Sequence, residues 1–312
     1  MKDANNRFIP AIQPVSATAA RPLWSVMIPT YNCADSLRLT LQSVLRQAPG
    51  PEQMHIEVVD DCSTRDDPEA VVNEIGRGRV KFFRQPQNVG AIANFNSCVQ
   101  RSTGQLVHIL HGDDLVEDGF YRALSGPLRQ NPEIGAAFCR QIYIDHLGRP
   151  IRTTRLEQPE SGIFTRALDV LAVSNRIPPP AIVIRRAVYE QIGGYDLRLF
   201  HAADWEMWVR IAAHYPVWYH TEPLALYRVH PGSDTSRLFK TGANMQNRRE
   251  AIDIFKTYLP PERANGLARR ALGYSTIFGL KMALKSLRQS PRLAWVQTRE
   301  ALICALQMLR PG

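Results

Sequence analysis

Residues 106–114 read LVHILHGDD, and this stretch decides the fold. Leu106–Leu110 has the apolar character of a strand that is buried on both faces of a sheet. Asp113 and Asp114 follow shortly after the run ends. An apolar run that stops at acidic side chains predicts a buried strand whose carboxyl end carries a polar site.

The same arrangement recurs twice nearer to the N-terminus. The apolar run Trp24–Pro29 stops at Thr30-Tyr31-Asn32, and His55–Val59 stops at Asp60-Asp61. Helix-like stretches separate the runs, and strands that alternate with helices indicate right-handed βαβ units and a parallel sheet. Ligands bind such sheets in the crevice beyond the carboxyl ends of the strands. We therefore expect the three polar clusters to form one site.

The composition is that of a globular protein. Of 312 residues, 45% are hydrophobic and 21% are charged, which excludes a disordered or collagen-like chain. The five cysteines are odd in number and contain no Cys-x-x-Cys pair, so we predict neither a disulfide framework nor a zinc knuckle, and a reducing cytoplasm suits them. Because no run approaches the ~20 apolar residues of a membrane span, and the N-terminus lacks a signal-peptide core, we expect neither secretion nor membrane integration.

Pattern and charge divide the chain into three parts. We expect a flexible lead over residues 1–20, an α/β domain over 21–238 and a basic helical region over 239–312. The formal charge of +9 belongs entirely to the last part, which holds 13 basic and 4 acidic side chains, whereas residues 1–238 hold 25 of each. Because the excess is confined to the tail, we expect no nucleic-acid partner.

Two acidic clusters could carry chemistry. Asp113 and Asp114 repel each other at the end of a buried strand, and a cation such as Mg²⁺ or Mn²⁺ would offset that repulsion. Alternatively, one of them caps the next helix and the other is solvated. Asp61 could accept a hydrogen bond from the N–H of a nucleobase, or it could form an Asx-turn with Ser63 and Thr64.

Three single residues are further candidates. Asp204 stands at the start of a helical apolar stripe, where it could act as a general base or simply cap the helix. Tyr31 could stack on a nucleobase or pack against the protein. His230 lies in a loop, where it could ligate a metal, contact a phosphate or stay a surface histidine. The sequence contains no dinucleotide fingerprint and no Walker loop, which disfavours hydride transfer and P-loop hydrolysis.

Five motifs together resemble the family 2 glycosyltransferases with the GT-A fold. They are Val26–Asn32, Val58–Ser63, Gln87–Gly90 with Asn94, His111–Asp114 and Ala203–Trp205. The resemblance covers roughly Leu23–Ser236. It implies a Rossmann-like, mostly parallel sheet flanked by helices, to which 239–312 would add a helical C-terminal extension. It also implies inverting transfer of a sugar from a nucleotide-diphosphate sugar, for which a UDP-sugar is expected.

The matched positions imply a site. The donor-binding residues would be Pro29, Thr30, Tyr31, Asp61, Asn88 and Asp113. Asp114 and Asp113, with His230 as a further candidate, would hold Mn²⁺ or Mg²⁺, and Asp204 would be the catalytic base. The chain departs from the family pattern in having Phe95 where many relatives place a basic residue, and Leu115 rather than a third Asp after the acidic pair.

The acceptor implied by the resemblance is a glycan or lipid-linked molecule, in surface polysaccharide or glycolipid synthesis. In residues 239–312, basic side chains interleave with apolar ones, as in Ala301–Leu309. This fits helices lying on the inner face of the cytoplasmic membrane, or a helical subdomain whose basic face is only solvated. We expect a cytoplasmic protein with peripheral membrane contact in the first case.

Two other functions stay open at this point. A sugar-phosphate nucleotidyltransferase shares a doubly wound sheet, but it needs a glycine-rich phosphate loop where this chain has Pro29-Thr30-Tyr31-Asn32. A sugar-nucleotide-binding module without catalysis would keep the donor site and lose the chemistry.

Overall fold

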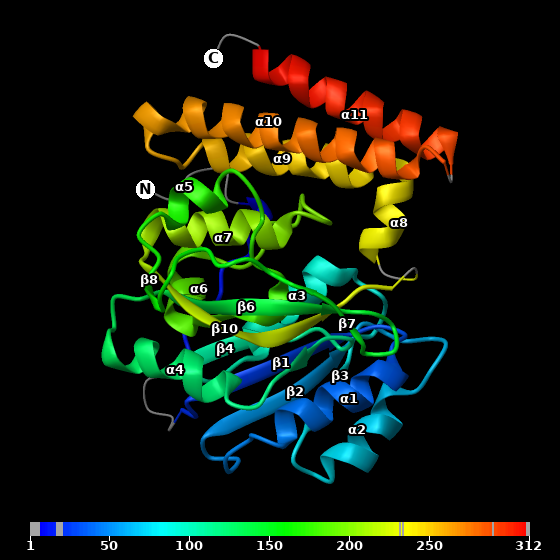
Figure 1. Cartoon of the computed structure of the whole chain (residues 1–312). Coiled ribbons are helices and arrows are strands. Elements are labelled where there is room, and N and C mark those ends of the chain that lie inside the picture. Colours follow the sequence, from blue (N-terminus) through cyan, green and yellow to red (C-terminus); the bar gives the residue numbers. More distant parts are fainter. Residues whose placement is uncertain (1–6, 17–20, 231, 233, 289, 310–312) are drawn as a thin grey trace. The chain divides into compact units, whose positions relative to one another are not determined.

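The computed structural model describes residues 7–16, 21–230, 232, 234–288 and 290–309 (Figure 1). The chain divides into two compact units, each made of separate segments. The first unit comprises Met1–Thr165, Ile177–Leu197 and Tyr215–Val229, and the second comprises Arg166–Arg176, Arg198–His214 and His230–Gly312. The domain division at residue 238 stays a prediction.

A ten-stranded sheet is the core of the first unit (Figure 1). Its strands are β1 (Trp24–Thr30), β2 (Met54–Asp60), β3 (Lys81–Arg84), β4 (Leu106–Ile109), β5 (Leu115–Val116), β6 (Ala136–Ile144), β7 (Pro150–Thr153), β8 (Gly162–Ile163), β9 (Ile182–Arg185) and β10 (Val217–Arg228). The strand order is β3-β2-β1-β4-β9-β6-β10-β5, with β7 beside β6 and β8 beside β10.

The sheet is parallel in one half and mixed in the other. Strands β3, β2, β1 and β4 run parallel, and β1 pairs with β2 from Trp24↔Met54 to Thr30↔Asp60. Beyond β4, strand β9 runs antiparallel to β4 and β6, while β6 and β10 are parallel. All residues of β1 and β4 are buried. The α/β fold is thus confirmed, with its parallel βαβ half where the alternation predicts it.

Helices flank this sheet. They are α1 (Ala34–Leu45), α2 (Pro68–Gly76), α3 (Ala91–Arg101), α4 (Phe120–Gln130), α6 (Arg186–Ile192) and the 3₁₀ turn η2 (Pro179–Ala181). Helix α1 buries Leu37, Leu41 and Val44, which share one face at helical spacing. Helix α3 begins after Gly90, whose φ of 87° favours glycine.

The lead expected over residues 1–20 lies partly outside the described residues, namely at 1–6 and 17–20. Its described part, 7–16, is attached to the first unit. The backbone N–H of Gly194 donates to the Pro10 carbonyl at 2.9 Å, and the N–H of Leu197 donates to that of Phe8 at the same distance. Ile12 is buried. These contacts order 7–16, because buried apolar surface and paired backbone groups offset the entropy of fixing the chain.

The second unit is helical. It contains α5 (Ala167–Leu171), α7 (Ala203–His214), α8 (Asp234–Thr241), α9 (Ala243–Lys256), α10 (Pro261–Ser286) and α11 (Pro291–Leu309). Helix α9 contacts α7, α10 and α11, and the rings of Trp205 and Phe255 meet edge to face at 5.2 Å. The helical C-terminal region is thereby confirmed. Within the described residues, no helix is both long and apolar enough to cross a membrane.

Candidate functional site

The carboxyl ends of β1, β2 and β4 are joined by backbone hydrogen bonds. The N–H of Asp61 donates to the Thr30 carbonyl at 2.9 Å, and the N–H of Gly112 donates to the Pro29 carbonyl at 3.0 Å. A carbon added to Gly112 would lie 2.5 Å from Thr30 Oγ1, so only glycine fits this close approach. The three polar clusters therefore meet at one edge of the sheet, within the first unit.

The first cluster presents one ring to solvent. Pro29 and Thr30 are buried, and Thr30 Oγ1 lies 2.9 Å from Cys33 Sγ. Burial, with the charge of Asp113 adding to it, raises the pKa of the Cys33 thiol to about 11. Tyr31 is 46% exposed. Tyr31 can thus offer its ring to a ligand, whereas Pro29 and Thr30 fix the shape of the edge behind it.

Asp61 holds the loop that precedes α3. Its Oδ1 accepts the N–H of Val89 at 2.7 Å, and its Oδ2 accepts the N–H of Gly90 at 3.0 Å. Asn88 Nδ2 donates to the Asp61 carbonyl at 3.1 Å. Burial raises the pKa of Asp61 in spite of these bonds. The structure therefore brings Asp61 and Asn88 together, and each carboxylate oxygen keeps a second lone pair for another donor.

The turn that follows β2 is formed by Asp60. The N–H of Ser63 donates to Asp60 Oδ2 at 3.1 Å, and Arg84 Nε donates to the same oxygen at 2.8 Å. The Asx-type interaction considered for Asp61 therefore belongs to its neighbour. This leaves Asp61 to bind the 88–90 loop.

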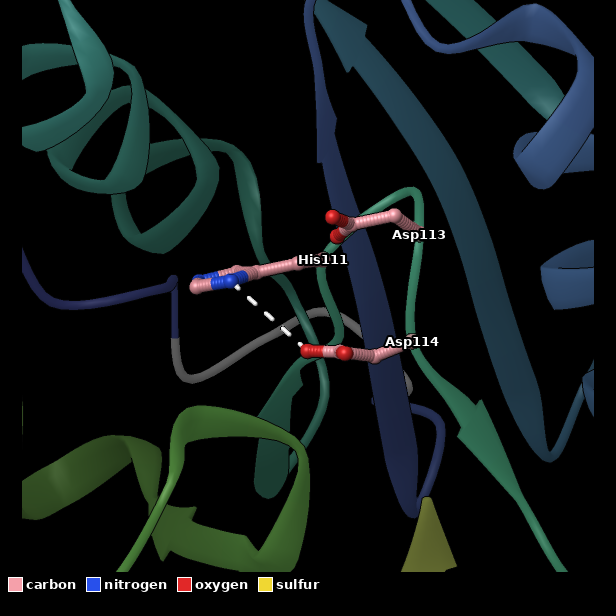
Figure 2. A group of neighbouring side chains, drawn as sticks. All are labelled: His111, Asp113 and Asp114. Carbon is pink, nitrogen blue, oxygen red and sulfur yellow. Dashed lines mark ion pairs between the residues drawn. The ribbon is translucent and has the colours of Figure 1, made fainter. Parts of the chain in front are cut away.

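His111, Asp113 and Asp114 form a compact cluster (Figure 2). One ligand atom from each lies within 4.8 Å of the others. Asp114 is buried, and its Oδ1 accepts the N–H of Arg228 at 2.8 Å. Within the described chain, Asp114 Oδ2 has no hydrogen-bond partner. His111 Nδ1 lies 3.8 Å from it, beyond hydrogen-bond length.

The surroundings of this cluster shift the pKa values of Asp114 and His111. Burial, followed by the neighbouring charge of Asp113, raises the pKa of Asp114 well above its ordinary value. Burial lowers the pKa of His111, so that its ring is neutral at pH 7. A buried carboxylate oxygen without a donor is costly unless a cation meets it. Two carboxylates and a neutral imidazole are a donor set that suits a divalent ion such as Mn²⁺, so these residues fit the expected metal.

His111 is the member of this cluster that the sequence prediction missed. It stands two residues before Asp113 in the stretch that decides the fold, but it has no partner at a standard metal spacing. Its ring stacks on Phe95, with centroids 4.8 Å apart and planes 20° apart. Phe95, the departure from the family pattern, thus orients His111.

Arg228 was also missed, and it fastens the acidic turn to a second loop. Its Nε donates to the Asp113 carbonyl at 2.8 Å, and its Nη1 donates to the carbonyls of Asp145 and His146 at 3.1 and 3.2 Å. Because its own N–H binds Asp114, one residue at the end of β10 holds both acidic residues.

Asp204 belongs to the second unit. It is the second residue of α7, so it does not occupy the capping position ahead of the helix. Its Oδ2 accepts from Asn175 Nδ2 at 2.8 Å, and its Oδ1 accepts from the N–H of Trp205 at 2.7 Å. Burial raises the pKa of Asp204 to about 6, although these bonds and the charge of Arg248 act in the opposite direction. The carboxylate is thus partly desolvated yet ionised at neutral pH.

Two tryptophans of α7 and the candidate His230 also belong to the second unit. Trp205 and Trp208 are buried and belong to its core. His230 also belongs to the second unit, and its proposed role as a metal ligand stays a prediction.

Comparison with known proteins identifies the chain's relatives. The family model described as "Glycosyl transferase family 2" matches residues 25–193. The uncharacterized protein MT1568 of Mycobacterium tuberculosis (strain CDC 1551 / Oshkosh) is 30% identical over 249 residues, which cover 76% of this chain and 77% of that protein.

Two solved structures share the fold. Staphylococcus aureus TarS 1–349 in complex with UDP-GlcNAc superposes with a TM-score of 0.69 at 17% identity, covering 92% of this chain and 81% of that one. Mannosyltransferase PcManGT from Pyrobaculum calidifontis, in complex with GDP-Man and Mn²⁺, gives a TM-score of 0.59 at 18% identity, covering 93% and 87%.

Proposed function

Because the chain belongs to glycosyl transferase family 2 and is a glycosyltransferase, we propose that it moves a sugar from a nucleotide-diphosphate sugar to a hydroxyl group of a glycan or lipid-linked acceptor, with inversion of the anomeric centre. One observation carries the proposal. The cluster of His111, Asp113 and Asp114, in which one buried oxygen has no donor among the described residues, lies at the sheet edge that also holds Asp61.

The donor would bind along this edge of the first unit. Tyr31 would stack on the base, and Asp61 would accept a base N–H with the lone pairs left free by Val89 and Gly90. Pro29, Thr30 and Asn88 would shape the pocket around them. We propose uridine as the base, with guanosine as the comparison, since TarS and PcManGT are described with UDP-GlcNAc and GDP-Man.

His111, Asp113 and Asp114 would hold Mn²⁺ or Mg²⁺. When bound, such an ion neutralises the charge that builds on a leaving diphosphate. The protein's own part is to keep His111 neutral and both carboxylates fixed, through Phe95 and Arg228.

Asp204 would take the proton from the acceptor hydroxyl. A general base must be deprotonated to act, and its pKa should lie near the working pH. Since the pKa of Asp204 is raised to about 6, the base is available at pH 7 and is lost as the pH falls through that value. Direct attack by the activated hydroxyl then inverts the configuration of the sugar.

The donor site can be tested by thermal unfolding with UDP and Mn²⁺. We expect a Mn²⁺-dependent stabilisation, which would reach about 2.7 kcal/mol at 100 times the dissociation constant. Asp114→Ala should abolish it, whereas Asp118→Ala, at an exposed carboxylate four residues on, should not. A Mn²⁺-dependent shift retained by Asp114→Ala would contradict the metal site. GDP in place of UDP reports the choice of base.

Asp204→Asn tests the chemistry separately. We expect donor binding to persist while transfer falls by roughly 10²- to 10⁴-fold, the usual contribution of a general base. Unchanged turnover would remove Asp204 as the base. A wild-type protein that binds donor without any turnover would instead be a binding module, and release of pyrophosphate from a nucleoside triphosphate would indicate a nucleotidyltransferase.

We further propose that helices α10 and α11 contact an anionic membrane surface. Both helices expose large apolar side chains, namely Ile277, Leu280 and Leu284 on α10, Leu287 just after it, and Trp295, Leu302, Leu306 and Leu309 on α11. Exposed basic side chains share these faces at helical spacing, namely Lys281 and Lys285 on α10 and Arg292 and Arg299 on α11. Apolar and basic groups on one face suit the headgroup region of a bilayer and fit a lipid-linked acceptor.

A further inference from the structure

Helix α9 is anchored to the segment that precedes Asp204. Asn247 Oδ1 accepts three successive backbone N–H groups, those of Phe200, His201 and Ala202, at 3.1, 2.8 and 3.0 Å. Asn247 is fully buried, and its Nδ2 donates to Glu250 Oε2 at 2.7 Å. One amide oxygen thus fixes the three residues that lead into α7, because it pairs the backbone N–H group of each of them.

The next residue of α9, Arg248, packs against the residue that follows Asp204. Its guanidinium carbon lies 4.4 Å from the centre of the Trp205 ring, and Phe278 lies 5.5 Å away. Its Nε donates to Ser275 Oγ at 3.3 Å. Within the described residues, its buried Nη2 has no hydrogen-bond partner. The group is therefore held by aromatic stacking, with its charge felt by Asp204.

Charged groups of α7, α5 and α10 pair with one another. Glu206 of α7 pairs with Arg210 at 2.8 Å and accepts from Tyr258, two residues after α9, at 2.7 Å. Asp169 of α5 pairs with Arg263 of α10. Burial, followed by the charge of Arg248, lowers the pKa of His201 to about 4, so this ring is neutral. Arg248 is thus the cation that the described structure sets against the Asp204 carboxylate.

We propose that Asn247 and Arg248 are positioning residues for Asp204. Asn247 sets the start of α7, and Arg248 holds Trp205 while supplying the positive charge that keeps the carboxylate ionised. This inference rests on the proposed role of Asp204 as the base. It gives the basic C-terminal region a part in the chemistry, because α9 lies in the stretch that carries the net charge of +9.

The titration of Asp204 tests Arg248 directly. In protein labelled with ¹³C at the aspartate carboxyl groups, NMR follows each carboxylate, and Asp204→Asn assigns its signal. Removing the cation should raise the pKa of Asp204, so Arg248→Met should move the titration to higher pH. Arg248→Lys, which keeps the charge, should restore most of it. Arg249→Met, which removes the neighbouring charge that pairs with Glu300 at 2.8 Å, should leave it in place.

Turnover of the nucleotide sugar gives the second readout. For Arg248→Met we expect kcat at pH 8 within about twofold of the wild type and kcat at pH 6 about fivefold lower, because a smaller fraction of the base is ionised. The KM for the donor should not change. An Asp204 titration that is the same in Arg248→Met and wild type overturns the proposal, whatever the turnover. Unchanged turnover in Asp204→Asn would instead remove the base itself.

Asn247→Ala tests the anchor. Loss of one acceptor for three N–H groups should lower kcat at every pH without raising the KM for the donor. Gln246→Ala, at an exposed position one residue earlier, is the matched control. If Asn247→Ala folds, as judged by circular dichroism, and keeps wild-type kcat, the anchor has no role in positioning. If it does not fold, Asn247→Ser, which keeps a hydroxyl acceptor, decides the same question.

Discussion

Two carboxylates with proposed roles, one in each unit, differ in their surroundings. In the part of the chain that the structure describes, one oxygen of Asp114 has no donor and lies beside a second carboxylate, whereas both oxygens of Asp204 accept hydrogen bonds, from Asn175 and Trp205. Burial raises the pKa of both. The first arrangement calls for a cation, and the second suits a group that exchanges a proton near neutral pH.

The raised pKa of Asp204 makes a prediction for stability. Its value of about 6 in the folded protein exceeds the ordinary 3.8, so the folded state binds the proton more tightly than the unfolded state. The stability linked to this proton is fully present below about pH 4 and is lost as the pH rises through 6. Asp204→Asn should therefore raise the free energy of unfolding at pH 8, by at most about 3 kcal/mol, and change it little at pH 4.

Urea unfolding at both pH values measures this effect. The corresponding change at an exposed carboxylate, Asp118→Asn, serves as the control. A destabilised Asp204→Asn at pH 8 would mean that the charge of the carboxylate stabilises the fold instead of straining it.

At the scale of elements, the site is a set of loops tied together across the sheet. Asp61 holds the loop before α3, and Arg228 at the end of β10 holds the Asp113–Asp114 turn and the loop after β6. Each tie uses backbone groups on one side, which fixes the path of the loop.

Arg228 can be tested through metal affinity. Partners that hold metal ligands typically contribute 10- to 100-fold to affinity, so Arg228→Met should weaken Mn²⁺ binding by about tenfold or more. Arg228→Lys should recover little, because a single ammonium group cannot reach the three carbonyls that the guanidinium binds.

Free Mn²⁺, measured by electron paramagnetic resonance, reports the affinity without any turnover. Arg149→Met is the matched control, because Arg149 lies in the loop after β6 that Arg228 binds but its side chain is 70% exposed. Equal affinities in Arg228→Met and wild type would show that the turn holds its shape without the arginine.

The sequence could predict those parts of the site that are local. Asp61, Asp113 and Asp114 each lie within a few residues of the end of an apolar run, and strand ends in a parallel sheet converge. Their partners could not be predicted in this way, because Arg228 reaches Asp114 across 114 positions and Asn175 reaches Asp204 across 29. Periodicity indicates which face of an element is buried, but it does not name the side chain that will meet it.

For the whole molecule, the charge of +9 and the proposed metal chemistry belong to different units. The acidic cluster lies in the first unit, and the exposed apolar and basic faces of α10 and α11 lie in the second. The excess of basic side chains thus belongs to the unit proposed to contact a membrane, and not to the unit proposed to hold the metal.

Liposome flotation of the full chain tests the membrane contact. We expect binding to vesicles that contain anionic lipid, weaker binding to neutral ones, and loss at high salt, because screening shortens the reach of the basic residues. Leu284→Ser with Leu306→Ser should reduce flotation, since about 0.8 kcal/mol is lost for each CH₂ no longer buried in the bilayer. Leu147→Ser with Ile151→Ser, at equally exposed positions of the first unit, is the matched control. Flotation that depends neither on the lipid charge nor on the substitutions in α10 and α11 would refute the contact.

Gly112 constrains the acidic stretch through the lack of space around it, and not through charge. Any side chain there would collide with Thr30 Oγ1 at 2.5 Å and Cys33 Sγ at 3.0 Å, at the point where β1 and β4 are joined. A substitution at Asp113 or Asp114 should therefore leave the sheet in place, whereas a larger residue at Gly112 should disturb the join of β1 and β4. The lack of space at Gly112 constrains the sheet whether or not the acidic pair binds a metal.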